Sequence, residues 1–302
     1  MTMQGHILLG RLLPGVFLLL CLAVTAPASA REPAHERVVS IGGAVTEIIH
    51  ELGAEAQLVA VDSTSLYPPD ALERLPDVGY LRALSAEPIL ALKPDLVLAL
   101  EEAGPPEALA HLRSAGVRVE IVPNDPTPAG VAEKTRVVGT ALGLAEEADR
   151  LAKRLESELT ALEAALAEAE PRPRVLFLLS VGRGAPMAAG RETTADGIIS
   201  LAGGRNAVRA FESFKPLSPE AALSAAPEVL LVTRNTLEAL GGRESLLDRP
   251  EIAGTPAGET GRLVVMDALL LLGFGPRTPQ AVRELAAELQ PNLALPETPR
   301  SQ

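Results

Sequence analysis

An internal repeat constrains the fold of this chain more than any other feature of its sequence. The pattern Leu-Ser-x-Glu-x-x-Leu-x-x-x-Pro-(Asp/Glu)-x-x-Leu begins at Leu84 and begins again at Leu217, 133 residues later. In each copy a helical segment is followed by a proline, an acidic residue and an apolar run typical of a strand. The sequence therefore predicts two related units, each containing the same helix-then-strand element.

Apolar runs typical of buried strands alternate with helical segments on both sides of the middle of the chain. The expected strands are 38–41, 57–61, 96–100, 117–122, 175–179, 229–233 and 262–266. The expected helices are 46–52, 88–92, 107–114, 196–202, 220–225 and 280–289. This alternation is typical of parallel sheets covered by helices on both faces, so we expect an α/β protein with two Rossmann-like lobes.

One long amphipathic helix is predicted between the lobes. Apolar residues recur every three or four positions through a charged stretch that ends before Pro171: Leu144, Ala148, Leu151, Leu155, Leu159, Leu162 and Leu166. The same spacing allows a coiled coil as the alternative. We expect an N-terminal lobe at 31–143, a connecting helix at 144–170 and a C-terminal lobe at 171–302. A helical connector implies a stiff hinge, so the lobes should close little around a ligand.

The first 30 residues have the pattern of a signal peptide, with Arg11, an apolar run at 16–24 and a small-residue cleavage site ending at Ala30. The apolar run is shorter than the roughly 20 residues of a membrane-spanning helix, so we expect no stable membrane insertion. Cys21 allows a lipoprotein as the alternative, although Leu20 stands where a small residue is usual. Cleavage after Ala30 would remove the only cysteine and leave a protein without thiols or disulfides.

The formal net charge of −12 argues against nucleic acid and anionic membrane surfaces as partners. Aromatic residues make up only 2% of the chain, so a large planar ligand would be held mostly by aliphatic side chains.

Tyr80 has the clearest ligand chemistry of any residue. The chain contains two tyrosines and no tryptophan, and Tyr80 lies in a predicted loop just before the first copy of the repeat. A phenolate oxygen is a hard ligand suited to ferric iron, and the guanidinium group of Arg82 favours the phenolate form. The alternative for Tyr80 is a half-buried surface tyrosine whose hydroxyl bonds the backbone. The alternative for Arg82 is a surface charge at a helix start.

The string Val-Gly-Tyr-Leu-Arg at 78–82 resembles the haem-binding members of the periplasmic substrate-binding proteins that feed ABC importers. The segments 185–190, 194–197 and 203–207 carry the same resemblance, which spans essentially the whole mature chain. It implies a class III periplasmic binding protein, in which two lobes joined by a long helix hold the ligand in the cleft between them. It also implies a monomer that carries ferric haem b to the permease dimer, and its ATPase, of an ABC transporter.

Within this resemblance Tyr80 corresponds to the axial ligand of the haem iron. Some relatives add a histidine from the loop after the first strand of the second lobe, but residues 180–187 contain none. The histidines of the mature chain lie near its start or on predicted first-lobe helices: His35, His50 and His111. The resemblance therefore implies five-coordinate ferric haem on Tyr80 alone.

Further residues are candidates for the haem pocket. Arg82 would donate to the Tyr80 oxygen or pair with a propionate, and Arg183 would pair with a propionate on the opposite face. Met187 would help to close that face. Tyr67, which precedes Pro68 and Pro69, would line the cleft or pack its own loop.

Glu87 and Glu220 occupy matching positions in the two copies of the repeat. Each is explained separately as a glutamate stabilised at a helix start. In the related cobalamin-binding protein, however, the equivalent glutamates dock onto arginines of the two permease subunits. The resemblance thus implies that Glu87 and Glu220 are permease-docking residues, one on each lobe.

No enzyme motif is present: the chain lacks a phosphate-binding P-loop, a dinucleotide-binding glycine pattern, a serine-hydrolase elbow and a His-Glu-x-x-His zinc motif. We therefore expect a carrier without catalytic activity. The alternatives are a binding protein for cobalamin or a ferric siderophore and, more remotely, an exported α/β enzyme.

Overall fold

The computed structural model describes residues 1–2, 37–167, 169–179 and 186–296. The chain from Pro33 onward forms one compact unit, which is described here by itself. The predicted signal peptide at 1–30, Cys21 within it, and His35 lie outside the described residues. Among the described residues, no helix combines the length and apolar character needed to cross a lipid bilayer.

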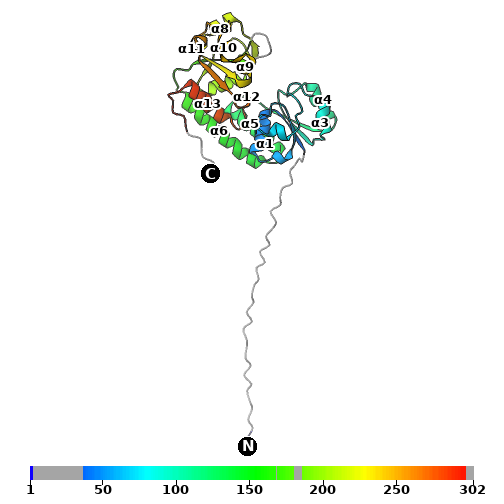
Figure 1. Ribbon diagram of the computed structural model, residues 1–302. Coiled ribbons are helices and arrows are strands. Elements are labelled where there is room, and N and C mark those ends of the chain that lie inside the picture. Colours follow the sequence, from blue (N-terminus) through cyan, green and yellow to red (C-terminus); the bar gives the residue numbers. More distant parts are fainter. Residues whose placement is uncertain (3–36, 168, 180–185, 297–302) are drawn as a thin grey trace. The chain divides into compact units, whose positions relative to one another are not determined.

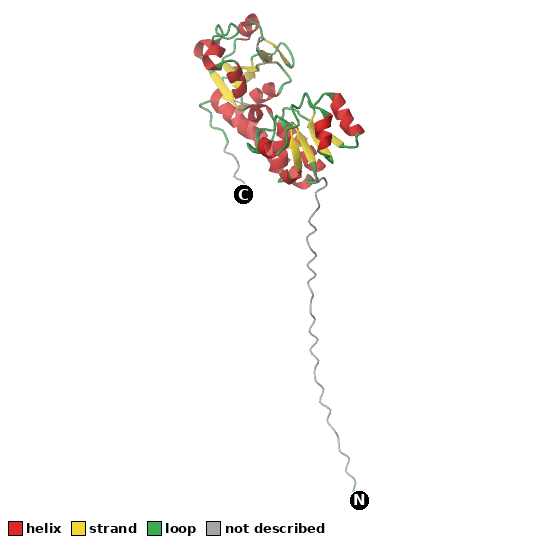
Figure 2. Ribbon diagram, turned by 45° about the vertical axis from the view of Figure 1, so that its right-hand side comes forward, coloured by secondary structure: helices red, strands yellow, loops and turns green. Residues whose placement is uncertain are grey.

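A parallel sheet with the strand order β2-β1-β3-β4 forms the centre of the first lobe. Its strands are β1 (Val38–Ile41), β2 (Leu58–Val61), β3 (Leu96–Leu100) and β4 (Arg118–Val122). The helices around them are α1 (Gly43–Glu51), α2 (Ala71–Arg74), α3 (Ala86–Ala91) and α4 (Pro106–Ser114). Helices lie on both sides of the sheet (Figure 2), so every residue of β1 and β3 is buried, as in other parallel sheets.

The second lobe contains a mixed sheet with the order β10-β9-β5-β6-β8, and β7 pairs with β5. Its strands are β5 (Arg174–Leu179), β6 (Met187–Ala189), β7 (Arg205–Asn206), β8 (Phe214–Pro216), β9 (Val229–Thr233) and β10 (Leu263–Met266). Its helices are α7 (Thr194–Leu201), α8 (Pro219–Ala225), α9 (Arg234–Ala239), α10 (Gly242–Leu247), α11 (Pro256–Thr260), α12 (Ala268–Leu272) and α13 (Thr278–Leu289).

The expectation of a purely parallel second sheet is wrong, because β6 runs antiparallel to both β5 and β8. Strands of three residues such as β6 and β8 carry too few side chains to show a period of two in the sequence. The repeat itself is confirmed in the structure. Its copies form α3 followed by β3 and α8 followed by β9.

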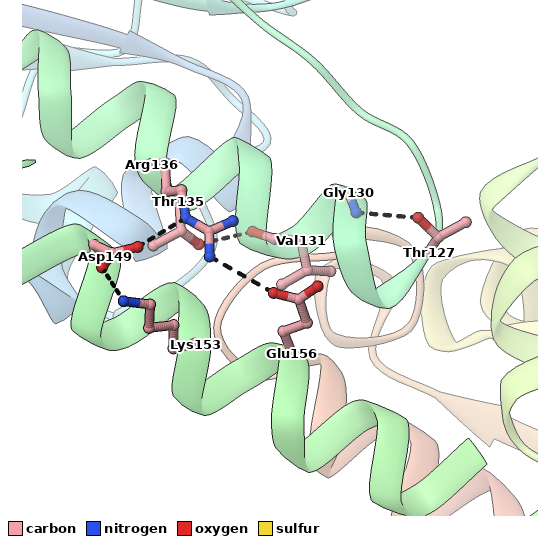
Figure 3. A network of polar contacts seen from close by, with 8 residues as sticks. All are labelled: Thr127, Gly130, Val131, Thr135, Arg136, Asp149, Lys153 and Glu156. Carbon is pink, nitrogen blue, oxygen red and sulfur yellow. Dashed lines mark hydrogen bonds and ion pairs between the residues drawn. The ribbon is translucent and has the colours of Figure 1, made fainter. Parts of the chain in front are cut away.

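Two helices, rather than one, connect the sheets: α5 (Pro128–Ala141) and α6 (Ala145–Ala167), which lie side by side (Figure 1). A side chain at Gly139 would clash with Ala148, so this glycine permits the close approach. Arg136 of α5 pairs with Asp149 at 3.1 Å and with Glu156 at 3.6 Å (Figure 3). These pairs are partly exposed and contribute little stability. The close packing of the two helices therefore has to come mainly from their buried residues.

The predicted apolar stripe of α6 is confirmed, and it packs within its own chain. Five of its leucines belong to the core of the second lobe: Leu151, Leu155, Leu159, Leu162 and Leu166. Helix α5 contributes to both cores, with Val131 in the second lobe and Val138 in the first. The stripe is thus occupied inside the molecule and not free for a coiled coil.

Candidate ligand-binding site

The segment that carries Tyr80 crosses the carboxyl edge of the first sheet. The Ser63 amide, just after β2, donates to the Gly79 carbonyl at 3.0 Å. Farther along, the Leu84 amide donates to the Gly104 carbonyl, in the loop after β3, at 2.8 Å. Strand β1 lies between β2 and β3 in the sheet. Tyr80 therefore lies where the strand order reverses direction, which is the usual ligand-binding position of open α/β sheets.

Local geometry turns the Tyr80 side chain toward solvent. Gly79 has a φ of +96°, which favours glycine, and the Ala83 amide donates to the Tyr80 carbonyl at 2.8 Å to close a tight turn. Leu81 and Leu84 are buried in the first-lobe core and hold this turn in place. Tyr80 itself is 47% exposed, and its hydroxyl has no hydrogen bond to any described residue. Arg82 is exposed on the same turn.

A buried polar network fixes the neighbouring loop after β2. Asp62, fully buried, accepts hydrogen bonds from the Gly42 amide at 2.8 Å, the Thr64 hydroxyl at 2.7 Å and the Ser65 hydroxyl at 3.0 Å. The Thr46 hydroxyl bonds Ser65 in turn at 2.7 Å. Helix α1 begins at Gly43, so Thr46 lies inside the helix and does not start it as the sequence suggested. The network makes the loop that leads to Tyr67 rigid.

Tyr67 contacts the second lobe through Arg277, just before α13. The Arg277 guanidinium lies over the Tyr67 ring, 3.8 Å from its centre. Arg277 also pairs with Glu47 of α1, with its Nε donating to Glu47 Oε1 at 3.1 Å. Burial raises the pKa of Glu47, and the hydrogen bond and charge of Arg277 partly offset that rise. Tyr67, still 40% exposed, is thus fixed in position by a cation–π contact.

Lys134 of α5 makes a second contact between the lobes. Its fully buried ammonium group donates to Asn124 Oδ1 at 2.5 Å and to the carbonyls of Gly273 and Phe274 at 3.1 and 3.0 Å. Burial lowers the pKa of Lys134 to about 8, although nearby carboxylates such as Glu102 act in the opposite direction. All three ammonium hydrogens are therefore used, two of them to join α5 to the segment between α12 and α13 and one to bind Asn124, after β4.

The remaining predicted residues lie on other elements or beyond the described ranges. Met187 is half-buried at the start of β6, where it pairs with Leu179 and Pro216. Arg183 lies outside the described residues. Of the two histidines that are described, His111 is exposed on α4 and His50 is half-buried on α1.

Glu87 and Glu220 are both exposed in the first turn of a helix, α3 and α8 respectively. Hydrogen bonds from its own backbone and from the Ser218 side chain lower the pKa of Glu220. Its carboxylate is thus held in the charged form that an ionic contact requires.

Sequence reasoning missed Glu47, Asp62, Lys134 and Arg277. Asp62 could have been found, because it directly follows an apolar strand and begins the polar string Asp-Ser-Thr-Ser. Lys134 and Arg277 give no such signal, since their partners in the other lobe are more than 100 residues away in the chain.

Comparison with known proteins agrees with this architecture. Residues 38–270 match the family model described as periplasmic binding protein. The periplasmic heme-binding protein RhuT from Roseiflexus sp. RS-1 is 44% identical, with a TM-score of 0.82 over 86% of this chain and 99% of that chain. The periplasmic heme-binding protein BhuT, solved in complex with two hemes, is also 44% identical, with a TM-score of 0.80 over 85% of this chain and 99% of that chain.

A cobalamin-binding protein of Halobacterium salinarum is more distant, at 29% identity over 83% of this chain and 68% of its own length. The match of the family model extends over most of the chain, from β1 to α12. This chain belongs to the periplasmic binding protein family, and its α/β fold is that of the class III members.

Proposed function

We propose that this protein binds ferric haem in the periplasm, with the Tyr80 phenolate as the axial ligand, and delivers it to an ABC permease. The observation that carries the proposal is the exposed Tyr80 hydroxyl, which is free of hydrogen bonds to the described residues and lies at the reversal of strand order. A phenolate is an established axial ligand of haem iron. The protein needs no chemistry beyond binding and release.

The surroundings of Tyr80 suit a porphyrin. Leu66 and Tyr67, in the loop after β2, are large apolar side chains with 43% and 40% of their surface exposed. Such surface would stack against the macrocycle and gain from leaving water. Arg82, exposed on the Tyr80 turn, would donate to the phenolate or pair with a propionate. The proposal places haem in the cleft between the lobes, with Arg183 and Met187 on the opposite side.

Cobalamin is the second candidate ligand, because curated relatives are named as cobalamin-binding proteins. The Tyr80 turn favours haem instead, since an anionic oxygen is a better ligand for ferric iron than for a cobalt that already has its own base. A ferric siderophore would bring its own oxygen ligands and leave Tyr80 without a role.

Titration with haemin and with cyanocobalamin in parallel tests the proposal. We expect haemin to saturate the protein and produce the absorption spectrum of a tyrosinate-ligated ferric haem, whereas cyanocobalamin should give no saturable change. Because BhuT was solved with two hemes, the titration should run past two equivalents to fix the stoichiometry. Saturable binding of cyanocobalamin without saturation by haemin would refute the proposal.

Delivery is assigned to Glu87 and Glu220. Both carboxylates are exposed on helices of the repeated unit, one in each lobe. A carrier with two related lobes offers one charged contact to each subunit of a permease dimer.

A further inference from the structure

A pocket lies in the second lobe, on elements other than those that carry the Tyr80 turn. It has a volume of about 330 Å³ and is lined by three arginines, Arg172, Arg205 and Arg209, together with Asp196 and Asn206. Arg172 precedes β5, Asp196 is in the first turn of α7 and Arg205 begins β7. Two of the segments that carry the family resemblance, 194–197 and 203–207, thus meet at this pocket.

The charges in this pocket are not balanced within the protein. Among the described residues, Arg205 and Arg209 form no ion pair or side-chain hydrogen bond. Arg172 makes one long hydrogen bond, from Nη2 to the Ser200 carbonyl at 3.4 Å, and its Nε is shielded from solvent without any partner in the described part of the chain. Shielded donors without partners raise the free energy of the folded state.

Asp196 does not neutralise this cluster. Its Oδ1 accepts a hydrogen bond from the Asn206 amide at 3.0 Å, and Asn206 also donates to the carbonyls of Ala189 and Gly190. The hydrogen bond between Asn206 and Asp196 therefore joins β7 to α7 at the wall of the pocket. One carboxylate against three guanidinium groups leaves a local excess of positive charge in a chain whose formal net charge is −12.

We propose that this pocket is a binding site for a phosphoryl group, either as free phosphate or as the headgroup of an anionic phospholipid. Guanidinium groups present paired N–H donors that match the oxygens of a phosphate, and a phosphate dianion would balance the excess charge. One water takes about 30 Å³ in the liquid, so the pocket has room for a phosphoryl group and a short organic substituent. The inference does not depend on haem binding.

Calorimetric titration with inorganic phosphate, and co-sedimentation with vesicles of phosphatidylcholine containing phosphatidylglycerol, test the proposal. Both use the mature chain without haem. The test variant is Arg205→Gln and the matched control is Arg234→Gln, which removes one charge from an exposed arginine on α9 outside the pocket. Thermal unfolding of both variants checks that the fold is intact.

We expect Arg205→Gln to weaken the binding of phosphate or of vesicles by roughly tenfold or more, because it removes charge-assisted hydrogen bonds. Arg234→Gln should bind like the wild type. Binding of inorganic phosphate would identify a free anion as the ligand, and binding of vesicles alone would identify a lipid headgroup. The proposal is overturned if neither probe binds, or if the two variants lose binding equally.

Discussion

The exposure of Tyr80 follows from the residues on either side of it. Gly79 adopts a positive φ that lets the chain turn, and buried Leu81 and Leu84 hold the following residues against the core. The sequence predicted a loop at this position, because the signal is local, and it left a Tyr80 hydroxyl bonded to the backbone as the alternative. It did not predict that Arg277, from the other lobe, lies over Tyr67. That contact joins residues 210 positions apart, and no local pattern encodes it.

At the same scale, Arg82→Ala should weaken ferric haem binding less than the loss of Tyr80, because it removes a donor to the phenolate oxygen or to a propionate and not the iron ligand itself. Haemin titrations of the two variants measure this difference in affinity. Arg82→Lys keeps the charge and should recover part of the lost affinity. Wild-type affinity in Arg82→Ala would limit Arg82 to a surface role.

At the scale of elements, apolar runs predicted most strands correctly, because central parallel strands are buried on both faces. Helix α5 was missed, since buried Lys134 and Thr135 interrupt its apolar face. Strands β6 and β8 were missed because they are short and extend the sheet in an antiparallel direction. Whether a side chain is buried against another lobe depends on tertiary contacts, and the periodicity of a single sequence does not predict those contacts.

Lys134→Met tests the buried contact made by α5. The pKa of Lys134 in the fold is about 8, below its ordinary value of 10.5. Between these values the unfolded chain carries a proton that the folded protein has released, so this residue makes stability rise with pH across that window. The free energy of unfolding of the wild type, measured with denaturant at pH 8 and at pH 10, should include this rise with pH. The Lys134→Met variant should lack it.

The same variant should be about 1–3 kcal/mol less stable at pH 7, because three acceptors, two of them in buried hydrogen bonds, lose their donor. Lys153→Met is a matched control, since Lys153 pairs with Asp149 on the exposed face of α6. Equal changes in stability with pH for the wild type and Lys134→Met would contradict the assignment.

At the scale of the whole molecule, the duplicated unit places one exposed glutamate on each lobe, Glu87 and Glu220. Single substitutions to alanine should leave haem binding unchanged and impair stimulation of the ATPase of the cognate transporter by the haem-loaded protein. Each lost charge-assisted contact is worth about 1.5–3 kcal/mol, so the double variant should nearly abolish stimulation. Substitution by lysine at either position should impair stimulation of the ATPase more than substitution by alanine, because it would set a positive charge against the positive charges of the permease.

The transporter assay, in membranes or reconstituted vesicles, needs one control. Glu107→Ala removes an equivalent first-turn glutamate from α4, outside the repeated unit. It should stimulate the ATPase as the wild type does. Wild-type stimulation by the Glu87 and Glu220 double variant would contradict a docking role and would leave both residues as ordinary glutamates at helix starts.

The most direct test of the central claim is the visible spectrum of the haemin complex of Tyr80→Phe. This substitution removes only the phenol oxygen and leaves the ring, the turn and both cores in place. The account predicts that Tyr80→Phe loses the tyrosinate-type ferric spectrum and most of its affinity, whereas Tyr67→Phe, which keeps the ring under Arg277, resembles the wild type. An unaltered ferric haem spectrum in Tyr80→Phe would contradict the account.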